Sequence, residues 1–213
     1  MCRFHDAVAH AVRHPRRAVD NRPATMADTA TSILIGLTLI AGLSVLIAST
    51  LTGAPSLPST RLMAQDVIAL LDEEAVPAQA PIYEFGSGWG SLAIALARAF
   101  PQAQIIGIEI SPVPYLASRI RALRYPNLRF EWGDFRKRDT SDAHAITCYL
   151  MPALMPRVAQ HLDANAQPGT RVICVEFWFR GRHVVAARRE NRRGAVALYR
   201  WPARLPPDRS GSL

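Results

Sequence analysis

Cysteine and histidine are scarce in this sequence, and neither is arranged to bind a metal. The 213 residues contain three cysteines, Cys2, Cys148 and Cys174, and six scattered histidines. An odd number of widely spaced cysteines argues against a disulfide framework, and no pair has the spacing of zinc ligands. We therefore expect no metal site. Cys148 and Cys174 lie in apolar runs, and we expect them to be buried thiols in a reducing compartment.

Lysine is almost absent: Lys137 is the only one, so the 25 basic residues are nearly all arginine. The formal net charge of +8 would suit a nucleic-acid binder or a protein lying against anionic lipid, because both partners present dense phosphate. However, arginine without lysine is more typical of a GC-rich coding sequence than of a surface selected for phosphate. We therefore predict no nucleic-acid partner.

Charge of either sign is missing between Asp28 and Arg61, and residues 33–51 are mostly Ile, Leu, Val, Ala and Gly. At about 1.5 Å per residue, a helix of this length reaches roughly the thickness of a hydrocarbon core. We therefore expect a transmembrane helix, with the lipid bilayer as a partner. A cleaved signal peptide normally has a shorter apolar region, and a buried core helix is seldom apolar on all sides.

The length allows one α/β domain with an appendage but not two full domains. The expected organisation is an N-terminal tail, a transmembrane helix, a Pro- and Ser-rich linker and a folded domain, at residues 1–28, 29–54, 55–60 and 61–213.

Apolar runs alternate with helical patterns along the folded domain. Helices are expected at 61–74, 91–99, 115–123 and 156–162, and strands at 81–85, 105–110, 128–132, 145–150 and 171–177. Short apolar strands separated by helices form right-handed βαβ units. We therefore predict an α/β fold with a Rossmann-like, doubly wound, mostly parallel sheet. Residues 184–187 and 195–201 are expected to add a hairpin to it.

A glycine-rich loop follows the first expected strand and leads directly into a helix. Its sequence is Glu-Phe-Gly-Ser-Gly-Trp-Gly-Ser, from Glu84 to Ser91, and a side chain at Gly86 or Gly88 would obstruct a ligand at the end of the strand. A dinucleotide site would have its third glycine at position 91, where this chain has serine. Glu84 suits the ammonium of an aminoacyl group and would repel a pyrophosphate. S-adenosylmethionine has that ammonium and no phosphate.

Two further acidic residues follow the next two expected strands. Glu109, which precedes Ile110, can accept hydrogen bonds from both hydroxyls of a ribose. Asp134 can accept from the adenine amino group, with Phe135 and other apolar neighbours covering the ring, although a lone Asp after a strand is often a helix cap. The predicted cofactor-binding residues are therefore Glu84, Gly86, Ser87, Gly88, Gly90, Glu109, Ile110, Asp134 and Phe135.

Through Glu84 to Ser91, Glu109 and Asp134, the chain resembles the class I S-adenosylmethionine-dependent methyltransferases over roughly residues 60–201. More narrowly, it resembles the small membrane-anchored family that includes the ATP synthase c-subunit lysine N-methyltransferases. The shared traits are the apolar N-terminal segment, the glycine loop, and the motifs Gly107-Ile108-Glu109, Ser111-Pro112, Leu150-Met151-Pro152 and Phe177-Trp178. Trp89 departs from this family, whose members often have an acidic residue there, and the segment after Phe179 is short and Arg-rich.

The resemblance implies a methyltransferase that acts on a lysine of a membrane protein. The loop after strand 145–150 lies where class I enzymes present the acceptor, so Tyr149, Met151 and Pro152 are the candidate catalytic residues. Packing at the end of a buried strand is the alternative role for Tyr149 and Met151. Two other functions remain open: methylation of a small or lipid-soluble acceptor such as a quinone or phospholipid headgroup, and a non-catalytic membrane-anchored scaffold.

The arginines around the apolar segment predict an orientation that conflicts with this cofactor. Five arginines precede the segment and only Arg61 follows it closely, so the positive-inside rule would export the folded domain. Because the methyl donor is made and kept in the cytosol, we hypothesise that translation starts at Met26. This start predicts a single-pass protein, in the bacterial inner membrane, with a cytoplasmic catalytic domain. A mitochondrial presequence is the alternative, weakened by Asp6 and Asp20.

Overall fold

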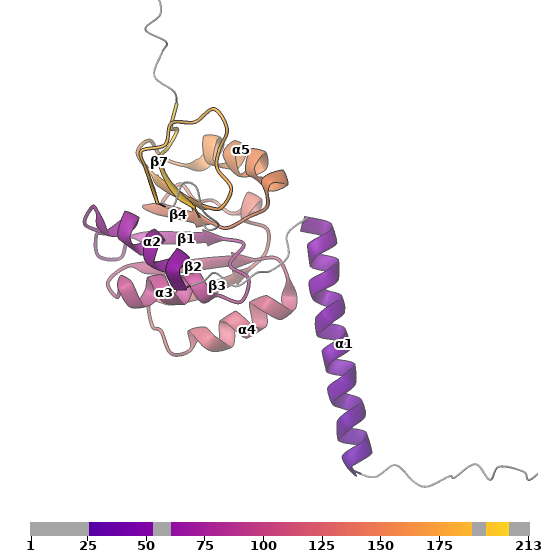
Figure 1. The fold of residues 1–213 in the computed structure, drawn as a ribbon. Helices are drawn as coiled ribbons and strands as arrows, with labels where there is room; N and C mark the ends of the chain where they lie inside the picture. Colours follow the sequence, from indigo (N-terminus) through magenta and orange to yellow (C-terminus); the bar gives the residue numbers. More distant parts are fainter. Residues whose placement is uncertain (1–25, 53–60, 189–194, 205–213) are drawn as a thin grey trace, which may run out of the picture. The chain divides into compact units, whose positions relative to one another are not determined.

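A computed structural model of the chain describes residues 26–52, 61–188 and 195–204 (Figure 1). Residues 1–25, 53–60, 189–194 and 205–213, which include the predicted tail and linker, lie outside the described residues. The division into tail, helix, linker and domain therefore stays a prediction at these segments.

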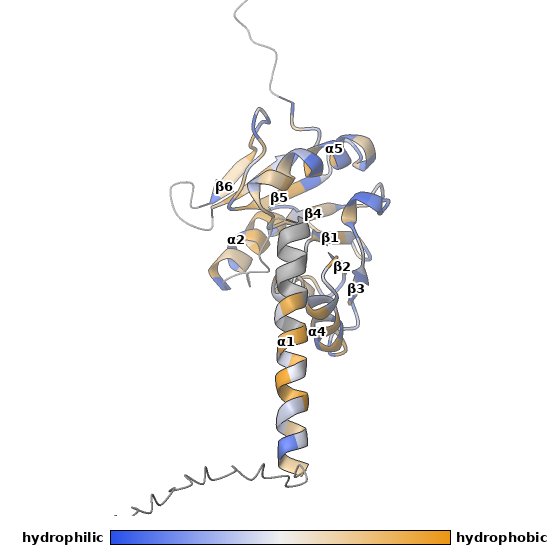
Figure 2. Cartoon of the chain, turned by 90° about the vertical axis from the view of Figure 1, so that its right-hand side faces the viewer, coloured by the Kyte–Doolittle hydropathy of each residue, from blue (hydrophilic) through white to orange (hydrophobic). Residues whose placement is uncertain are grey.

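The expected N-terminal helix is present as α1 (Met26–Thr52). Its first turns are polar: the hydroxyls of Thr31 and Ser32 donate to the carbonyl oxygens of Ala27 and Asp28, at 2.8 and 2.9 Å. Figure 2 shows this polar start and the apolar residues that follow it. Among the described residues, no helix combines the length and the apolar character that a membrane span requires. The predicted transmembrane helix over 29–54 is therefore not supported.

The domain is built on one seven-stranded sheet, in the order β3-β2-β1-β4-β5-β7-β6. Its strands are β1 (Pro81–Phe85), β2 (Gln104–Glu109), β3 (Leu128–Trp132), β4 (Ala145–Cys148), β5 (Arg171–Val175), β6 (Ala186–Arg188) and β7 (Val196–Arg200). The first five pair in parallel, whereas β7 runs antiparallel to both β5 and β6. The predicted doubly wound, mostly parallel sheet with a terminal hairpin is confirmed.

Helices cover both faces of this sheet because residues along each strand alternate between two apolar clusters. Ile82 and Ile105 belong to the cluster that includes α2 (Arg61–Asp72), α3 (Ser91–Ala99) and the end of α4 (Pro112–Ala122). Tyr83 and Ile106 belong to the other cluster, with α5 (Met155–Asn165) and the short helix η1 (Phe135–Lys137). A second short helix, η2 (Pro152–Leu154), precedes α5.

Several predicted elements differ from the observed ones at their ends. Strands β4 and β5 end at Cys148 and Val175, earlier than the apolar runs suggested, so Tyr149 and Glu176 fall in the loops at the edge of the sheet. Cys148 and Cys174 are buried free thiols, as expected, with their sulfur atoms 3.4 Å apart on neighbouring strands.

Candidate functional site: the carboxyl ends of the parallel strands

The loop between β1 and α3 folds back over the carboxyl end of β2. The backbone N–H groups of Gly86 and Ser87 both donate to the carbonyl oxygen of Ile108, at 2.9 and 3.0 Å. Gly86, Gly88 and Gly90 have φ angles of +70°, +53° and +76°, in the left-handed region that only glycine adopts without strain. The predicted glycine loop is thus a tight turn whose path requires these glycines.

The space beside two of these glycines is filled by side chains. A Cβ at Gly86 would lie 2.5 Å from a terminal methyl of Leu150, and a Cβ at Gly90 would lie 2.5 Å from the ring of Phe130. Phe130 also lies against Gly107 of β2. A side chain at Gly86 would therefore meet Leu150, and one at Gly90 would meet Phe130. That the loop also leaves room for a ligand stays a prediction.

Glu109 ends β2 and ties the loop to it. The carboxylate is 5% exposed, and it accepts hydrogen bonds from the N–H of Gly88 and the N–H of Ser111, each at 2.7 Å. A carboxylate has about four acceptor positions, so two remain for the hydroxyls of a ribose. Ser111 was not among the predicted site residues. Its place two residues after the acidic strand end is the signal that could have identified it.

Glu84 lies in β1, two residues before Gly86, and is 3% exposed. Burial is the main reason that its pKa rises to about 8, opposed by a hydrogen bond from the backbone of Ala93 and reinforced by the charge of Glu109. One of its oxygens, Oε2, has no hydrogen-bond partner among the described residues, and the same is true of the buried hydroxyl of Ser87. Two unpaired polar atoms at one loop are what an ammonium-bearing cofactor would satisfy.

Asp134 follows β3 and caps η1. Its carboxylate accepts from the backbone N–H of Arg136 at 3.0 Å and is also bound by the guanidinium of Arg136, at 2.9 Å from Nε. The Arg136 side chain is the main cause that lowers the pKa of Asp134. Recognition of an adenine amino group by Asp134 stays a prediction, and it would require Arg136 to give up part of this contact.

Apolar surface next to Glu109 comes from residues other than Phe135. Phe135 is buried and stacks on Phe85 of β1, with ring centroids 4.7 Å apart, so it packs in the core. Ile110 is 42% exposed, and its carbonyl oxygen accepts from the indole N–H of Trp132, whose side chain is 65% exposed. Ile110 and Trp132 thus present exposed apolar surface after β2 and at the end of β3, and contact of Ile110 with the cofactor stays a prediction.

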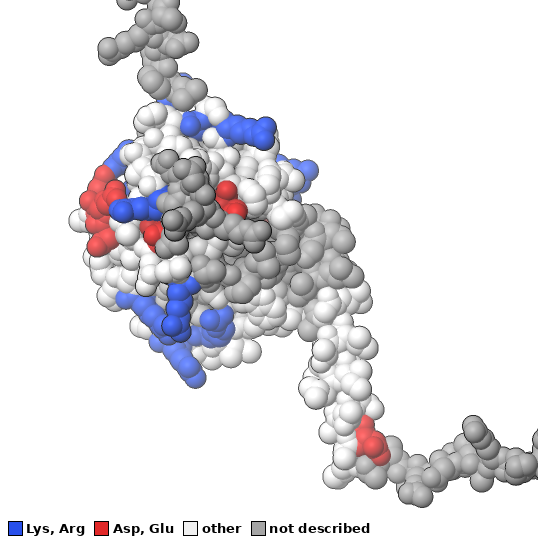
Figure 3. Space-filling view, in the orientation of Figure 1, with Lys and Arg blue, Asp and Glu red and all other residues white. Residues whose placement is uncertain are grey.

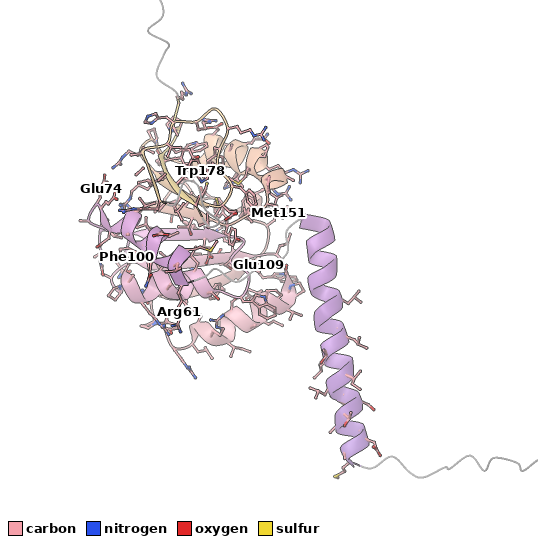
Figure 4. All side chains as sticks on the ribbon, in the orientation of Figure 1. Arg61, Glu74, Phe100, Glu109, Met151 and Trp178 are labelled. Carbon is pink, nitrogen blue, oxygen red and sulfur yellow. The ribbon has the colours of Figure 1, made fainter. Side chains whose placement is uncertain are left out.

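The predicted acceptor residues follow β4 at the same end of the sheet. Figure 4 shows Met151 and Glu109 at this end, with Glu74 and Phe100 at the opposite one. Tyr149 is partly buried, and burial, followed by the negative charge of Glu176, raises its pKa. Met151 is partly buried and Pro152 is exposed at the start of η2. Trp178, after β5, has a buried indole N–H without a partner among the described residues.

The sheet order, the glycine loop and the acidic residues that end β1 and β2 define a class of protein. They are the features of the cofactor-binding half of the class I S-adenosylmethionine-dependent methyltransferases, and the chain has the fold of this class. Among described residues, no group of His, Cys, Asp and Glu side chains is placed to hold a metal ion.

The comparisons with known proteins agree with this class. A family model described as the ANTKMT methyltransferase domain matches residues 84–186. The ATP synthase c-subunit lysine N-methyltransferase of Rattus norvegicus is 29% identical over 129 residues, which are 59% of this chain and 56% of the rat protein. The chain thus spans about half the length of such relatives: its match to the mouse protein covers 49% of that protein.

Two further matches come from prokaryotes. A protein-lysine N-methyltransferase of Saccharolobus islandicus is 27% identical over 124 residues, covering 55% of this chain and 77% of that protein. The crystal structure of an RNA methyltransferase from Salinibacter ruber, in complex with S-adenosyl-L-homocysteine, is 26% identical with a TM-score of 0.60. It covers 71% of this chain and 98% of the Salinibacter chain.

Proposed function

We propose that the protein is a protein-lysine N-methyltransferase whose acceptor is a membrane protein. The main structural support is that Tyr149 and Glu176 directly follow the paired strands β4 and β5, where burial and then the negative charge of Glu176 raise the pKa of the Tyr149 phenol. A lysine side chain carries an ammonium that such a pair would attract. The names of the rat, mouse and archaeal relatives give independent support.

The cofactor-binding residues have separate tasks in this proposal. Glu84 and Ser87, with their unpaired oxygens, would hold the aminoacyl end, and Glu109 would hold the ribose while keeping the loop in place. The bound cofactor supplies an electrophilic methyl group on a sulfonium. These contacts fix the position of that group, and alignment is the largest contribution that a methyltransferase of this kind makes.

The acceptor residues must deliver a neutral amine. Because its pKa is raised, Tyr149 stays protonated at physiological pH, so its hydroxyl acts as a hydrogen-bonding group and not as a strong base. We propose that this hydroxyl orients the amine nitrogen, while Glu176 attracts the incoming ammonium and Met151 and Pro152 exclude water. The incoming lysine ammonium would first lose one proton to solvent. Its nitrogen would then form the bond to the methyl carbon as the sulfur–methyl bond breaks, with the electron pair of that bond left on sulfur in the thioether product, so charge and atoms balance.

Localisation at a membrane, with the domain in the cytoplasm, is part of the same proposal. Its support is the acceptor named for the rat and mouse relatives, which is the c-subunit of ATP synthase. A small acceptor is the second candidate, because a trans-aconitate 2-methyltransferase of Deinococcus radiodurans is 32% identical over 105 residues, covering 46% of this chain and 39% of that protein.

The test is transfer of a labelled methyl group to cell fractions. The purified protein and labelled S-adenosylmethionine are incubated with membrane proteins, soluble proteins, lipid extract, total RNA and small metabolites from a strain that lacks the gene. We expect label in membrane proteins, recovered as methyl-lysine after acid hydrolysis, and strongly reduced label with Tyr149→Phe. Label confined to RNA, to lipid or to metabolites would replace the lysine acceptor with that class.

A further inference from the structure

Helix α4 presents an apolar stripe to solvent. Leu116, Ile120 and Leu123, the residue that caps the helix, are 53%, 68% and 84% exposed. Their spacing of four and three residues aligns them on one side of the helix. The residues that α4 buries against the sheet, Pro114 and Ala122 among them, lie on the opposite side. The stripe is therefore the outermost part of α4, where polar residues are the norm.

Arginines surround this stripe. By helical periodicity, Arg119 lies on one side of it and Arg121 on the other, and Arg124 follows in the turn after the helix. A cavity of about 280 Å³ between α3 and α4 is lined by Ile94, Arg98, Ile120, Arg121, Arg124 and Tyr125. Figure 3 shows blue side chains at the lower left, over α3 and α4 and close to Arg61 of α2, which Figure 4 labels in the same orientation, without red ones among them. We call Leu116, Ile120, Leu123 and these four arginines the α4 face.

Acidic residues are missing from this part of the chain. Between Phe85 and Phe130 the only one is Glu109, whose carboxylate is bound by backbone N–H groups at the cofactor site. Within residues 26–52, 61–188 and 195–204, Arg119 and Arg124 have no carboxylate partner. By contrast, arginines near the end of the chain are paired, Arg182 with Asp163 and Arg188 with Glu73.

We propose that the α4 face docks on a membrane surface that contains anionic phospholipids. Exposed leucine and isoleucine flanked by arginine is the pattern of a helix lying in the interface, with its apolar side chains among the upper acyl chains and its guanidinium groups on headgroup phosphates. In the cavity, Arg98 donates to the Tyr125 hydroxyl and Arg121 to the carbonyl oxygen of Trp89, so the proposal assigns the phosphate contacts to Arg119 and Arg124. RNA would use the arginines but leave the apolar stripe unexplained. The proposal does not depend on which acceptor is methylated.

The test uses the full chain and vesicles, without cofactor or acceptor. Binding of the protein is measured on phosphatidylcholine vesicles and on vesicles with added phosphatidylglycerol. A contribution of α1 that is equal on both kinds of vesicle does not affect the difference between them. We expect tighter binding to the anionic vesicles. Arg119→Gln combined with Arg124→Gln should lower that preference roughly tenfold. Ile120→Ser combined with Leu123→Ser should weaken binding to anionic vesicles as well.

Matched controls are Arg157→Gln on α5 and Leu62→Ser on α2, which remove an exposed arginine and an exposed leucine outside the α4 face. Both should bind like the unchanged protein. Amide exchange locates the contact directly: anionic vesicles should protect α4 and not α5. An anionic preference that survives the substitutions on the α4 face, or protection of α4 by an RNA oligomer or an acidic peptide but not by vesicles, would overturn the proposal.

Discussion

Glu109 holds the backbone of Gly88 by a 2.7 Å hydrogen bond, which joins the end of β2 to the middle of the glycine loop. The same carboxylate is the predicted ligand of the ribose. One side chain thus orders the loop and is predicted to bind the cofactor, so that a change at Glu109 should affect both the order of the loop and the contact with the ribose. The N–H of Ser111 donates to the other oxygen of the Glu109 carboxylate at 2.7 Å. This bond fixes an orientation of the carboxylate in which it can hold Gly88 and still accept from a ribose.

Replacement of Glu109 by alanine should weaken S-adenosylmethionine binding. The change removes two charge-assisted hydrogen bonds to the ribose, for a loss of roughly 2 to 4 kcal/mol, on the order of a hundredfold in the dissociation constant. Calorimetric titration of the purified protein measures it. Glu131→Gln, at a partly exposed ion pair with Arg129, is the control and should bind normally. Unchanged affinity in Glu109→Ala would mean that the ribose lies elsewhere.

Cofactor binding should release a proton from Glu84. With a pKa of about 8 before binding, this carboxyl is mostly protonated at pH 7, and the ammonium of the cofactor would lower its pKa and ionise it. Affinity should therefore increase as the pH rises from 6 towards 8. Titrations at pH 7 in two buffers with different ionisation enthalpies report the proton directly. The Glu84→Gln variant should show no release, and buffer-independent heats in the unchanged protein would contradict the assignment.

Burial of Glu84 also makes the stability of the free protein depend on pH. A carboxyl whose pKa is higher in the folded than in the unfolded state binds more protons when folded, so the free energy of unfolding decreases as the pH rises between the two pKa values. We expect the melting temperature of the cofactor-free protein to fall between about pH 5 and pH 8. Glu84→Gln should flatten this slope, and an equal slope in both proteins would assign it to other groups.

The parts of the fold that sequence predicts well are those set by local patterns. The buried runs at β1 and β3 have the predicted ends, and Gly86, Gly88 and Gly90 form the predicted turn. Contacts between distant segments were not predictable from a single sequence. Phe130 lies 40 residues from Gly90 in the chain, and nothing local indicates that its ring fills the space that this glycine leaves.

Asp134 illustrates a different limit. The pairing with Arg136, two residues away, and the role as a cap of η1 are local features, and the sequence indicates the cap as the alternative use of this carboxylate. Both uses of the carboxylate compete for the same oxygens. Sequence patterns do not rank such competing uses, because the ranking depends on the Arg136 side chain, which encloses the carboxylate in the folded protein.

Gly90→Ala should destabilise the domain more than its backbone angle alone requires. The φ of +76° costs a substituted residue about 1 to 2 kcal/mol, and the new Cβ would lie 2.5 Å from the ring of Phe130, for a total of roughly 2 to 5 kcal/mol. Gly181→Ala is the matched control, since its φ is +69° but no atom lies within 4 Å of its Cβ. Denaturant unfolding of both variants separates the two costs, and equal losses would show that Phe130 moves aside freely.

Tyr149→Phe should lower the turnover rate while leaving cofactor affinity unchanged, because the hydroxyl is proposed to orient the acceptor amine and is not among the groups proposed to bind the cofactor. Loss of one orienting hydrogen bond is expected to cost roughly tenfold in kcat, with the aromatic ring still filling its place after β4. Glu176→Gln removes the charge that raises the pKa of Tyr149, so it should raise KM for a cationic acceptor more than it lowers kcat. Steady-state kinetics on an identified acceptor, with cofactor titration as the control, distinguish the two effects. If Tyr149→Phe has full activity and Glu176→Gln has an unchanged KM, the two residues only pack at the ends of their strands, and the acceptor enters elsewhere.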